Sequence, residues 1–183
     1  MGSNAVRIIG GKWRGRKLVF PDRPDLRPTL GRVRETLFNW LRADIDGSRC
    51  LDLFAGSGAL GFEALSRGAA SVVFVEADRR AVQGLQDNVT RLAAGDRATV
   101  VAGRAERFLR RTTEPFEVIF VDPPFAGTDL PAVLEAIRAS GALAATGLVY
   151  FEAPRRLTVE ASGWRQVKHQ TAGDAQFGLL ATP

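Results

Sequence analysis

The sequence has little of the side-chain chemistry on which metal sites and nucleophilic triads depend. Its 183 residues include a single cysteine, Cys50, and a single histidine, His169. Disulfides, zinc sites of cysteine and histidine, Ser-His-Asp triads and Cys-His pairs therefore lack their components. No apolar run is long enough to span a membrane, and no secretory signal is visible. We therefore expect any chemistry to use carboxylates, backbone groups and a bound cofactor.

Positive charge is abundant but concentrated near the beginning of the chain. Residues 1–42 carry ten basic and three acidic side chains, a balance of +7 in a chain whose net charge is +5. The remainder of the chain is therefore close to neutral. Clustered arginine and lysine favour a polyanionic partner, although a solvated basic arm without a partner would have the same composition.

The order of the predicted elements indicates one α/β domain, which the length of the chain allows. A glycine-punctuated hairpin is expected over Val6–Phe20, and a helix begins at Thr29, a suitable N-cap. Apolar runs then alternate with helical patterns, which predicts a mostly parallel seven-stranded sheet with helices on both faces. A last hairpin around Gly173-Asp174 adds an antiparallel edge. The expected strands are 49–54, 71–76, 99–102, 116–121, 148–152, 164–171 and 175–182, and the expected helices between them are 60–67, 79–93, 105–110 and 130–140.

The stretch Asp122-Pro123-Pro124-Phe125 follows a predicted strand and is unusual for a simple turn. Proline has no N–H, so the backbone there offers mainly carbonyl acceptors. A carboxylate, an outward carbonyl and an aromatic face together suit a planar amine, which needs acceptors for its N–H groups and a surface for stacking. We therefore interpret the stretch as a substrate site for an amino group, with a proline-rich structural turn as the alternative.

A glycine-rich loop joins the first predicted sheet strand to its helix. Gly56, Gly58 and Gly61 fit the pattern G-x-G-x-x-G, in which glycines let backbone N–H groups approach a ligand at a helix start. Glu76 ends the next strand, twenty residues after Gly56, where a carboxylate can accept both hydroxyls of a ribose. The combination fits either a dinucleotide or S-adenosylmethionine.

Other features of the chain favour S-adenosylmethionine. The carboxylate of Asp52 lies just before the glycine loop, where it can meet an ammonium group but would serve no purpose for a pyrophosphate. The Asp122 stretch suits methylation of an amine and offers no partner for hydride transfer. The chain also has no room for a separate substrate domain.

Several stretches resemble bacterial 16S rRNA guanine-N2 methyltransferases. The most specific is RPT followed by RVRETLFNW, whereas the DPPF motif is shared with many enzymes that methylate amino groups. The resemblance begins near residue 6 and is weaker in the last third of the chain. One departure is Leu30-Gly31, which stands where the family usually has a polar pair. The matching stretches are 7–11, 27–29, 32–40, 51–61, 63–67 and 121–125.

The resemblance implies a Rossmann-like class I methyltransferase domain over residues 29–183 and an RNA-contacting hairpin flap over residues 6–28. It implies direct methyl transfer from S-adenosylmethionine to N2 of a flipped guanine, and a monomeric, cytoplasmic enzyme. The implied partner is 16S rRNA in the assembled or assembling small ribosomal subunit. Residues 1–5 are expected to be an expression-tag remnant.

The sequence and the resemblance together give three sets of expected site residues. The catalytic set is Asp122, Pro123, Pro124 and Phe125. The cofactor set is Thr29, Asp52, Phe54, Ala55, Gly56, Ser57, Gly58, Glu76, Ala77, Gly103, Arg104 and Ala105. The RNA set is Arg7, Lys12, Trp13, Arg14, Arg16, Lys17, Arg27, Arg32 and Arg34, with Trp13 available for stacking or packed in the hairpin.

Two other functions share parts of this pattern. A DNA adenine-N6 or cytosine-N4 methyltransferase needs the same amine pocket, but such enzymes usually carry a sizeable target-recognition domain. A non-catalytic RNA-binding protein could keep the fold, although intact Asp52, Glu76 and Asp122 argue against it. An NAD-dependent oxidoreductase is a more distant alternative.

Overall fold

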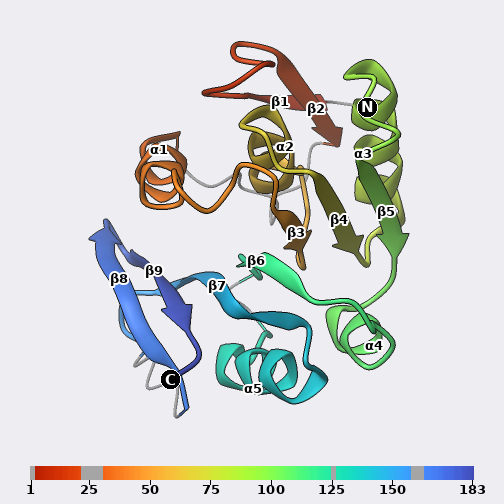
Figure 1. Ribbon diagram of the computed structural model, residues 1–183. Coiled ribbons are helices and arrows are strands. Elements are labelled where there is room, and N and C mark those ends of the chain that lie inside the picture. The colour runs from red at the N-terminus through yellow and green to blue at the C-terminus, as the bar shows by residue number, and fades with distance from the viewer. Residues whose placement is uncertain (1–2, 22–30, 125–126, 158–162) are drawn as a thin grey trace.

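The computed structural model describes residues 3–21, 31–124, 127–157 and 163–183, and it confirms the expected α/β fold. A seven-stranded sheet has the strand order β5-β4-β3-β6-β7-β9-β8, and β1 and β2 form a separate hairpin (Figure 1). The first five strands in that order pair in parallel, whereas β9 is antiparallel to β7 and β8. In chain order the elements are β1 (Ser3–Arg7), β2 (Lys17–Pro21), α1 (Gly31–Trp40), β3 (Arg49–Asp52), α2 (Ala59–Ser66), β4 (Ser71–Glu76), α3 (Arg79–Arg91), β5 (Ala98–Ala102), α4 (Ala105–Leu109), β6 (Phe116–Val121), α5 (Leu130–Ser140), β7 (Leu143–Pro154), β8 (Arg165–Ala172) and β9 (Ala175–Ala181).

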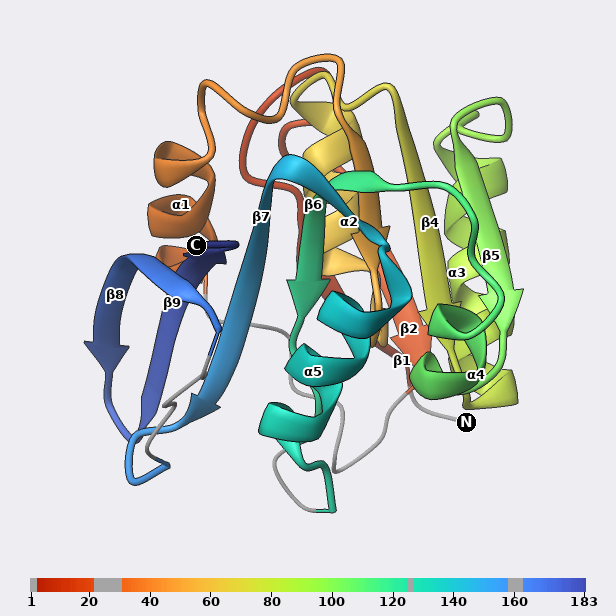
Figure 2. The ribbon, with the colours of Figure 1, turned by 60° about the horizontal axis from the view of Figure 1, so that its bottom comes forward.

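Helices cover both faces of the sheet. α1, α2 and α3 lie with the β1–β2 hairpin on one face, and α4 and α5 lie on the other (Figures 1 and 2). Side chains alternate along each strand, so Cys50 joins the core beneath α2 while Leu51 joins the core beneath α5. Burial on both faces explains why Phe116–Val121 reads as a nearly continuous apolar run.

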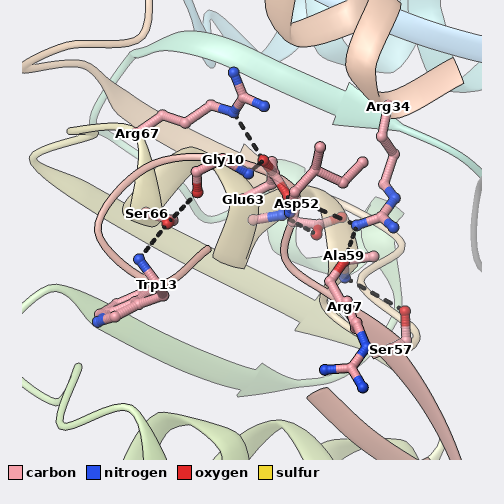
Figure 3. Close-up of polar contacts among 12 residues, drawn as sticks. Arg7, Gly10, Trp13, Arg34, Asp52, Ser57, Ala59, Glu63, Ser66 and Arg67 are labelled. Atoms are coloured by element: carbon pink, nitrogen blue, oxygen red, sulfur yellow. Dashed lines mark hydrogen bonds and ion pairs between the residues drawn. The ribbon is translucent and has the colours of Figure 1, made fainter. Parts of the chain in front are cut away.

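The β1–β2 hairpin is docked on the main domain by buried side chains of α2 and α3. The carboxylate of Glu63, which is fully buried, accepts hydrogen bonds from the backbone N–H groups of Ile9 and Gly10, both at 2.8 Å (Figure 3). On α3, the side-chain amide of Asn88 exchanges hydrogen bonds with the backbone N–H and carbonyl of Val19 at 3.1 and 2.9 Å. The hairpin is therefore fixed to the sheet domain along its inner side.

A second residue of α2 holds the turn of the hairpin. The Ser66 hydroxyl donates to the Gly10 carbonyl at 2.6 Å and accepts from the backbone N–H of Trp13 at 2.8 Å (Figure 3). The Ser66 carbonyl accepts from the backbone N–H of Lys12 at 2.7 Å. Gly11 has φ +73° and no space for a side chain, because a Cβ there would lie 1.9 Å from the same carbonyl. The turn can therefore reach α2 only with glycine at this position.

Some predicted boundaries differ from the structure. Residues 3–5, set aside as a tag remnant, belong to β1, where they pair with residues 19–21. β7 is much longer than the predicted 148–152, because it continues past a register shift opposite β6 and also pairs with β9. The helix start at Thr29 lies outside the described residues. The remaining strands and helices lie within a few residues of their predicted bounds.

Candidate active site

Acidic side chains gather at the carboxyl ends of the neighbouring strands β4, β3, β6 and β7. Asp52 of β3 pairs in register with Phe74 and Phe120, and Phe120 pairs with Tyr150. Because side chains alternate, residues two positions further along lie on this same face of the sheet. Those residues are Glu76, Asp122 and Glu152. Ligands of such sheets bind outside the carboxyl ends of the strands, so this acidic edge is the candidate active site.

Asp52 lies beneath the glycine loop and anchors it. Its carboxylate is 2% exposed and accepts a hydrogen bond from the backbone N–H of Gly61 at 3.0 Å. A Cβ on Gly61 would lie 2.3 Å from the ring of Phe74, so glycine is needed for α2 to approach β4 this closely. Asp52 is thus buried against the first turn of α2, and its predicted contact with the ammonium group of a cofactor stays a prediction.

Glu76 holds the outer part of the same loop. One carboxylate oxygen accepts from the backbone N–H of Gly56 at 2.8 Å, and the other accepts from the backbone N–H of Asp78 at 2.8 Å. Gly56 and Gly58 have φ values of 50° and 77°, a region that favours glycine. Because both oxygens of this half-buried carboxylate are held by hydrogen bonds, Glu76 is fixed at the edge where a ribose would bind.

The remaining predicted cofactor residues surround these two carboxylates. The backbone N–H of Gly103 donates to the Glu76 carbonyl at 2.8 Å, which brings the turn after β5 next to β4. Arg104 in this turn is exposed, whereas Ala105 is buried at the start of α4. Ser57 is also buried, and its hydroxyl accepts from the backbone N–H of Ala59 at 3.3 Å. The other members are Phe54, Ala55 and Gly58 in the loop and Ala77 after β4, while Thr29 lies outside the described residues.

The Asp122 turn borders a pocket between the ends of β6 and β7. The pocket has a volume of about 330 Å³, at the low end of the range for small ligands. Pro123 is buried and Pro124 is exposed, and both line the pocket. Phe125, predicted to stack on a base, lies outside the described residues. The rest of the lining is formed by Thr128, Leu130, Glu152, Ala153, Pro154, Arg156 and Leu157.

Two carboxyl groups on this edge, those of Asp52 and Glu152, have raised pKa values, mainly because they are buried. Burial raises the pKa of Asp52 to about 7, against the opposing Gly61 hydrogen bond, and the charges of Asp122 and Glu76 add to the effect. Burial likewise raises the pKa of Glu152 to about 8, with the Asp122 charge adding to it and a Tyr150 hydrogen bond opposing it. Perturbed acids at a concave edge are typical of functional sites.

Glu152 and Tyr150 were not predicted as site residues. The Tyr150 hydroxyl donates to Glu152 at 3.1 Å, and burial together with the Glu152 and Asp122 charges raises the pKa of Tyr150. A signal was present in the sequence, because the predicted strand 148–152 ends in an acid, as does the predicted strand 71–76, and Asp122 directly follows the predicted strand 116–121. The order of strands in space, which puts β7 beside β6, was needed to use it.

The predicted RNA residues divide into exposed and buried groups. Arg34 is 3% exposed, lies 3.7 Å from the Glu63 carboxylate and donates to the Arg7 carbonyl, so it stabilises the hairpin and does not face RNA (Figure 3). Trp13 is 4% exposed beneath the Arg97 guanidinium, so its ring is core and unavailable for stacking on a base. Arg27 lies outside the described residues. The exposed members are Arg7, Lys12, Arg14, Arg16, Lys17 and Arg32.

Comparison with known proteins shows to which family the chain belongs. The family described as Conserved hypothetical protein 95 matches residues 6–181, nearly the whole chain. The chain belongs to this family. A relative from Escherichia coli strain K12, the ribosomal RNA small subunit methyltransferase D, is 46% identical over 180 residues, which cover 97% of this chain and 90% of the relative.

Solved structures show the same similarity. An Escherichia coli protein provisionally named methyltransferase yhhF has a TM-score of 0.88 and 43% identity, with 98% of each chain covered. A Thermus thermophilus 16S rRNA N2 methyltransferase, solved with AdoMet and guanosine, has a TM-score of 0.73 and 22% identity, and covers 99% of this chain but 50% of its own. The latter shows the shared fold. Within the described ranges, no helix is long and apolar enough to cross a membrane.

Proposed function

We propose that this protein transfers a methyl group from S-adenosylmethionine to the exocyclic N2 of a guanine in small-subunit rRNA. The observation that carries the proposal is the continuous acidic edge, which sets the glycine loop and Glu76 beside the Asp122-Pro123 turn. A cofactor site and an amine site on adjoining strand ends are what methyl transfer requires. The relatives named ribosomal RNA small subunit methyltransferase D support methyl transfer to small-subunit rRNA.

The cofactor is assigned to the glycine loop and the ends of β4 and β5. Glu76 would accept hydrogen bonds from the ribose hydroxyls of the cofactor, and the turn that begins at Gly103 would line the pocket for its adenine ring. Asp52 acts through the loop, because its hydrogen bond to Gly61 fixes where the loop and the first turn of α2 lie. Glu76 offers acceptor oxygens and is half-buried, and Arg104 offers donors and is exposed, which suits a nucleoside with hydroxyl and amino groups.

The amine is assigned to Asp122 and the Pro123 carbonyl. When bound, S-adenosylmethionine supplies an electrophilic methyl group, so no covalent bond to the protein is needed. The N2 lone pair of guanine is delocalised into the ring and is a poor nucleophile. The Asp122 carboxylate and the Pro123 carbonyl accept hydrogen bonds from the two N–H groups of N2 and thereby orient its lone pair. Asp122 also takes the proton that methyl transfer releases. Orientation of this kind is worth about 7–11 kcal/mol when reactants are well aligned.

The RNA is assigned to the exposed face of the β1–β2 hairpin. Lys12, Arg14, Arg16 and Lys17 are exposed there, and the hairpin is docked on the domain from its other side. Basic side chains that contact phosphates supply affinity without sequence preference. We assign the partner as 16S rRNA within the small subunit, acted on by a monomer in the cytoplasm.

The test is transfer of labelled methyl from S-adenosylmethionine to undermethylated small ribosomal subunits. We expect label in N2-methylguanine, and we expect Asp122→Asn to reduce the rate about 10²- to 10⁴-fold while cofactor binding measured by calorimetry persists. Asp44→Asn, at an exposed aspartate after α1, is the matched control and should leave the rate unchanged. Naked 16S rRNA and duplex DNA are assayed in parallel. Label in DNA alone, or in no substrate despite cofactor binding, would contradict the proposal.

A further inference from the structure

Glu152 is an acid at the substrate side of the site for which the reaction so far has no use. It is half-buried, and it lines the same pocket as Pro123 and Pro124. The Tyr150 hydroxyl donates to its carboxylate at 3.1 Å and holds it in place. None of the ion pairs among the described residues involves Glu152.

The position of Glu152 is costly unless it serves a ligand. Its neighbour on the adjoining strand end is Asp122, and the two acids repel one another when both are ionised. A structural role would be filled more stably by an apolar side chain, because burying a carboxyl group without a full set of partners destabilises the fold. A half-buried acid that is oriented by a tyrosine and borders a pocket is instead arranged to meet a polar group.

The two acids are neighbours across adjoining strands. Asp122 follows β6, Glu152 lies near the end of β7, and neighbouring strands lie about 4.8 Å apart, so the two side chains can reach adjacent groups of one planar ligand. In guanine, the N1–H donor is the ring neighbour of the N2 amine. Adenine has an acceptor at N1, so a carboxyl oxygen that accepts a hydrogen bond at this position favours guanine over adenine.

We propose that Glu152 accepts the N1–H of the target guanine while Asp122 and the Pro123 carbonyl hold its N2 amine. This inference rests on the proposed function and adds the residue that makes the pocket specific for guanine. Tyr150 is a positioning residue in this arrangement, because its hydroxyl orients the Glu152 carboxylate. An oxygen with two lone pairs can accept from Tyr150 and from the base together.

Protonation of Glu152 extends the contact to a second atom of the base. With its pKa raised to about 8 by burial and by Asp122, the carboxyl group is neutral at lower pH and can also donate to O6. The groups that face Glu152 are Asp122 after β6 and Tyr150 on β7. The uncharged Phe177 on β9 is paired with Glu152, and Arg156 lines the same pocket. Ionisation removes the donor and adds a charge beside Asp122.

The experiment compares Glu152→Gln and Glu152→Met in methylation of undermethylated small subunits. Glutamine keeps an acceptor for N1–H and a donor for O6 but does not ionise, whereas methionine has a similar size and neither group. We expect Glu152→Met to lower kcat/KM for the subunit about 10- to 100-fold, with cofactor affinity unchanged. We expect Glu152→Gln to keep most of the activity below pH 8 and to lose the decline that the wild-type protein shows above about pH 8.

The outcomes separate this inference from the proposed function. Full activity of Glu152→Met, or the same alkaline decline in Glu152→Gln as in the wild type, would overturn the role of Glu152 while guanine methylation stands. Loss of activity in both variants with the fold and cofactor affinity intact would also overturn it, because an N1–H acceptor would not then be sufficient. If the wild-type protein puts no label into guanine N2, the proposed function itself fails.

Discussion

At the scale of the single residue, Glu63 joins three separate parts of the chain. Its buried carboxylate accepts from the backbone of Ile9 and Gly10 and from the Arg67 side chain at 2.8 Å, and it lies 3.7 Å from Arg34 (Figure 3). Burial lowers the pKa of Arg34, and the Glu63 charge opposes that effect. The carboxylate therefore balances two cations and two backbone donors at once.

Removal of this carboxylate should be costly. Glu63→Ala is expected to lower the free energy of unfolding by about 3–5 kcal/mol, because it leaves a buried arginine and two N–H groups without their acceptor. Urea unfolding followed by circular dichroism measures this change. Glu135→Ala, which breaks the fully exposed pair with Arg138, is the matched control and should have no measurable effect. Equal stability of the two variants would refute the argument.

Asp52 leads to a prediction about pH. Its pKa is about 7 in the folded protein against 3.8 in an unfolded chain, so the folded state binds the proton more tightly. The resulting stabilisation is complete below about pH 4 and is lost as the pH rises to about 7. Asp52→Asn keeps the acceptor for Gly61 and does not ionise. Its unfolding free energy relative to the wild type should therefore improve from pH 4 to pH 7, as measured by urea titrations; a constant difference would contradict the raised pKa.

At the scale of the element, α2 connects the two functional parts of the molecule. Its first turn receives Asp52 at Gly61, and its last turn contacts the hairpin through Glu63 and Ser66. The helix is buried along its whole length, so it cannot shift to accommodate a change at either end. α2 therefore fixes both the position of the hairpin and the shape of the glycine loop.

The docking of the hairpin can be weakened without touching the cofactor loop. Ser66→Ala removes the hydroxyl that binds the Gly10 carbonyl and the Trp13 N–H, at an expected cost of about 1–3 kcal/mol. We expect faster proteolytic cleavage within the hairpin and a lower kcat/KM for small subunits, with unchanged calorimetric affinity for S-adenosylmethionine. Ser140→Ala, at the end of α5, is the control. A loss of cofactor affinity in Ser66→Ala would contradict independent docking.

The extent of prediction from sequence also differs between elements. β4, β6 and α5 matched their predicted bounds because each has a clear end in the sequence. β4 ends at the acid Glu76, the apolar run of β6 stops before Asp122, and α5 stops before Gly141, which has a positive φ. Arg34 was misplaced and Trp13 was left open between stacking and packing, because their contacts with α2 and with Arg97, just before β5, are not visible in the sequence. Glu152 was overlooked because its meaning depends on β7 lying beside β6, and strand order is a property of tertiary structure.

At the scale of the whole molecule, we expect the exposed basic side chains of the hairpin to attract a polyanion. The hairpin turn is held at the last turn of α2, whereas Asp52 of the acidic edge contacts the first turn of the same helix. Each phosphate contact should make subunit binding more dependent on salt.

The salt dependence of subunit binding tests whether the hairpin contacts phosphates. Arg14→Ala is expected to weaken subunit binding and to reduce the slope of log affinity against log salt by about 0.7–0.9, the value for one lost phosphate contact. Filter binding or fluorescence anisotropy over a range of salt concentrations measures the slope. Arg138→Ala on α5, on the opposite face of the sheet from the hairpin, should leave it unchanged. An unaltered slope in Arg14→Ala would remove that residue from the RNA surface.

The docking of the hairpin on α2 limits how this protein can be re-engineered. A flap taken from another enzyme to redirect it to a new RNA would need backbone donors where Ile9 and Gly10 meet Glu63, and a glycine with positive φ at position 11. A foreign flap transplanted alone would leave Glu63 and Ser66 of α2 facing a backbone that does not supply their hydrogen-bond partners. The exchangeable module is thus the hairpin together with the inward face of α2, and new specificity is best sought by changing the outward side chains of the existing hairpin.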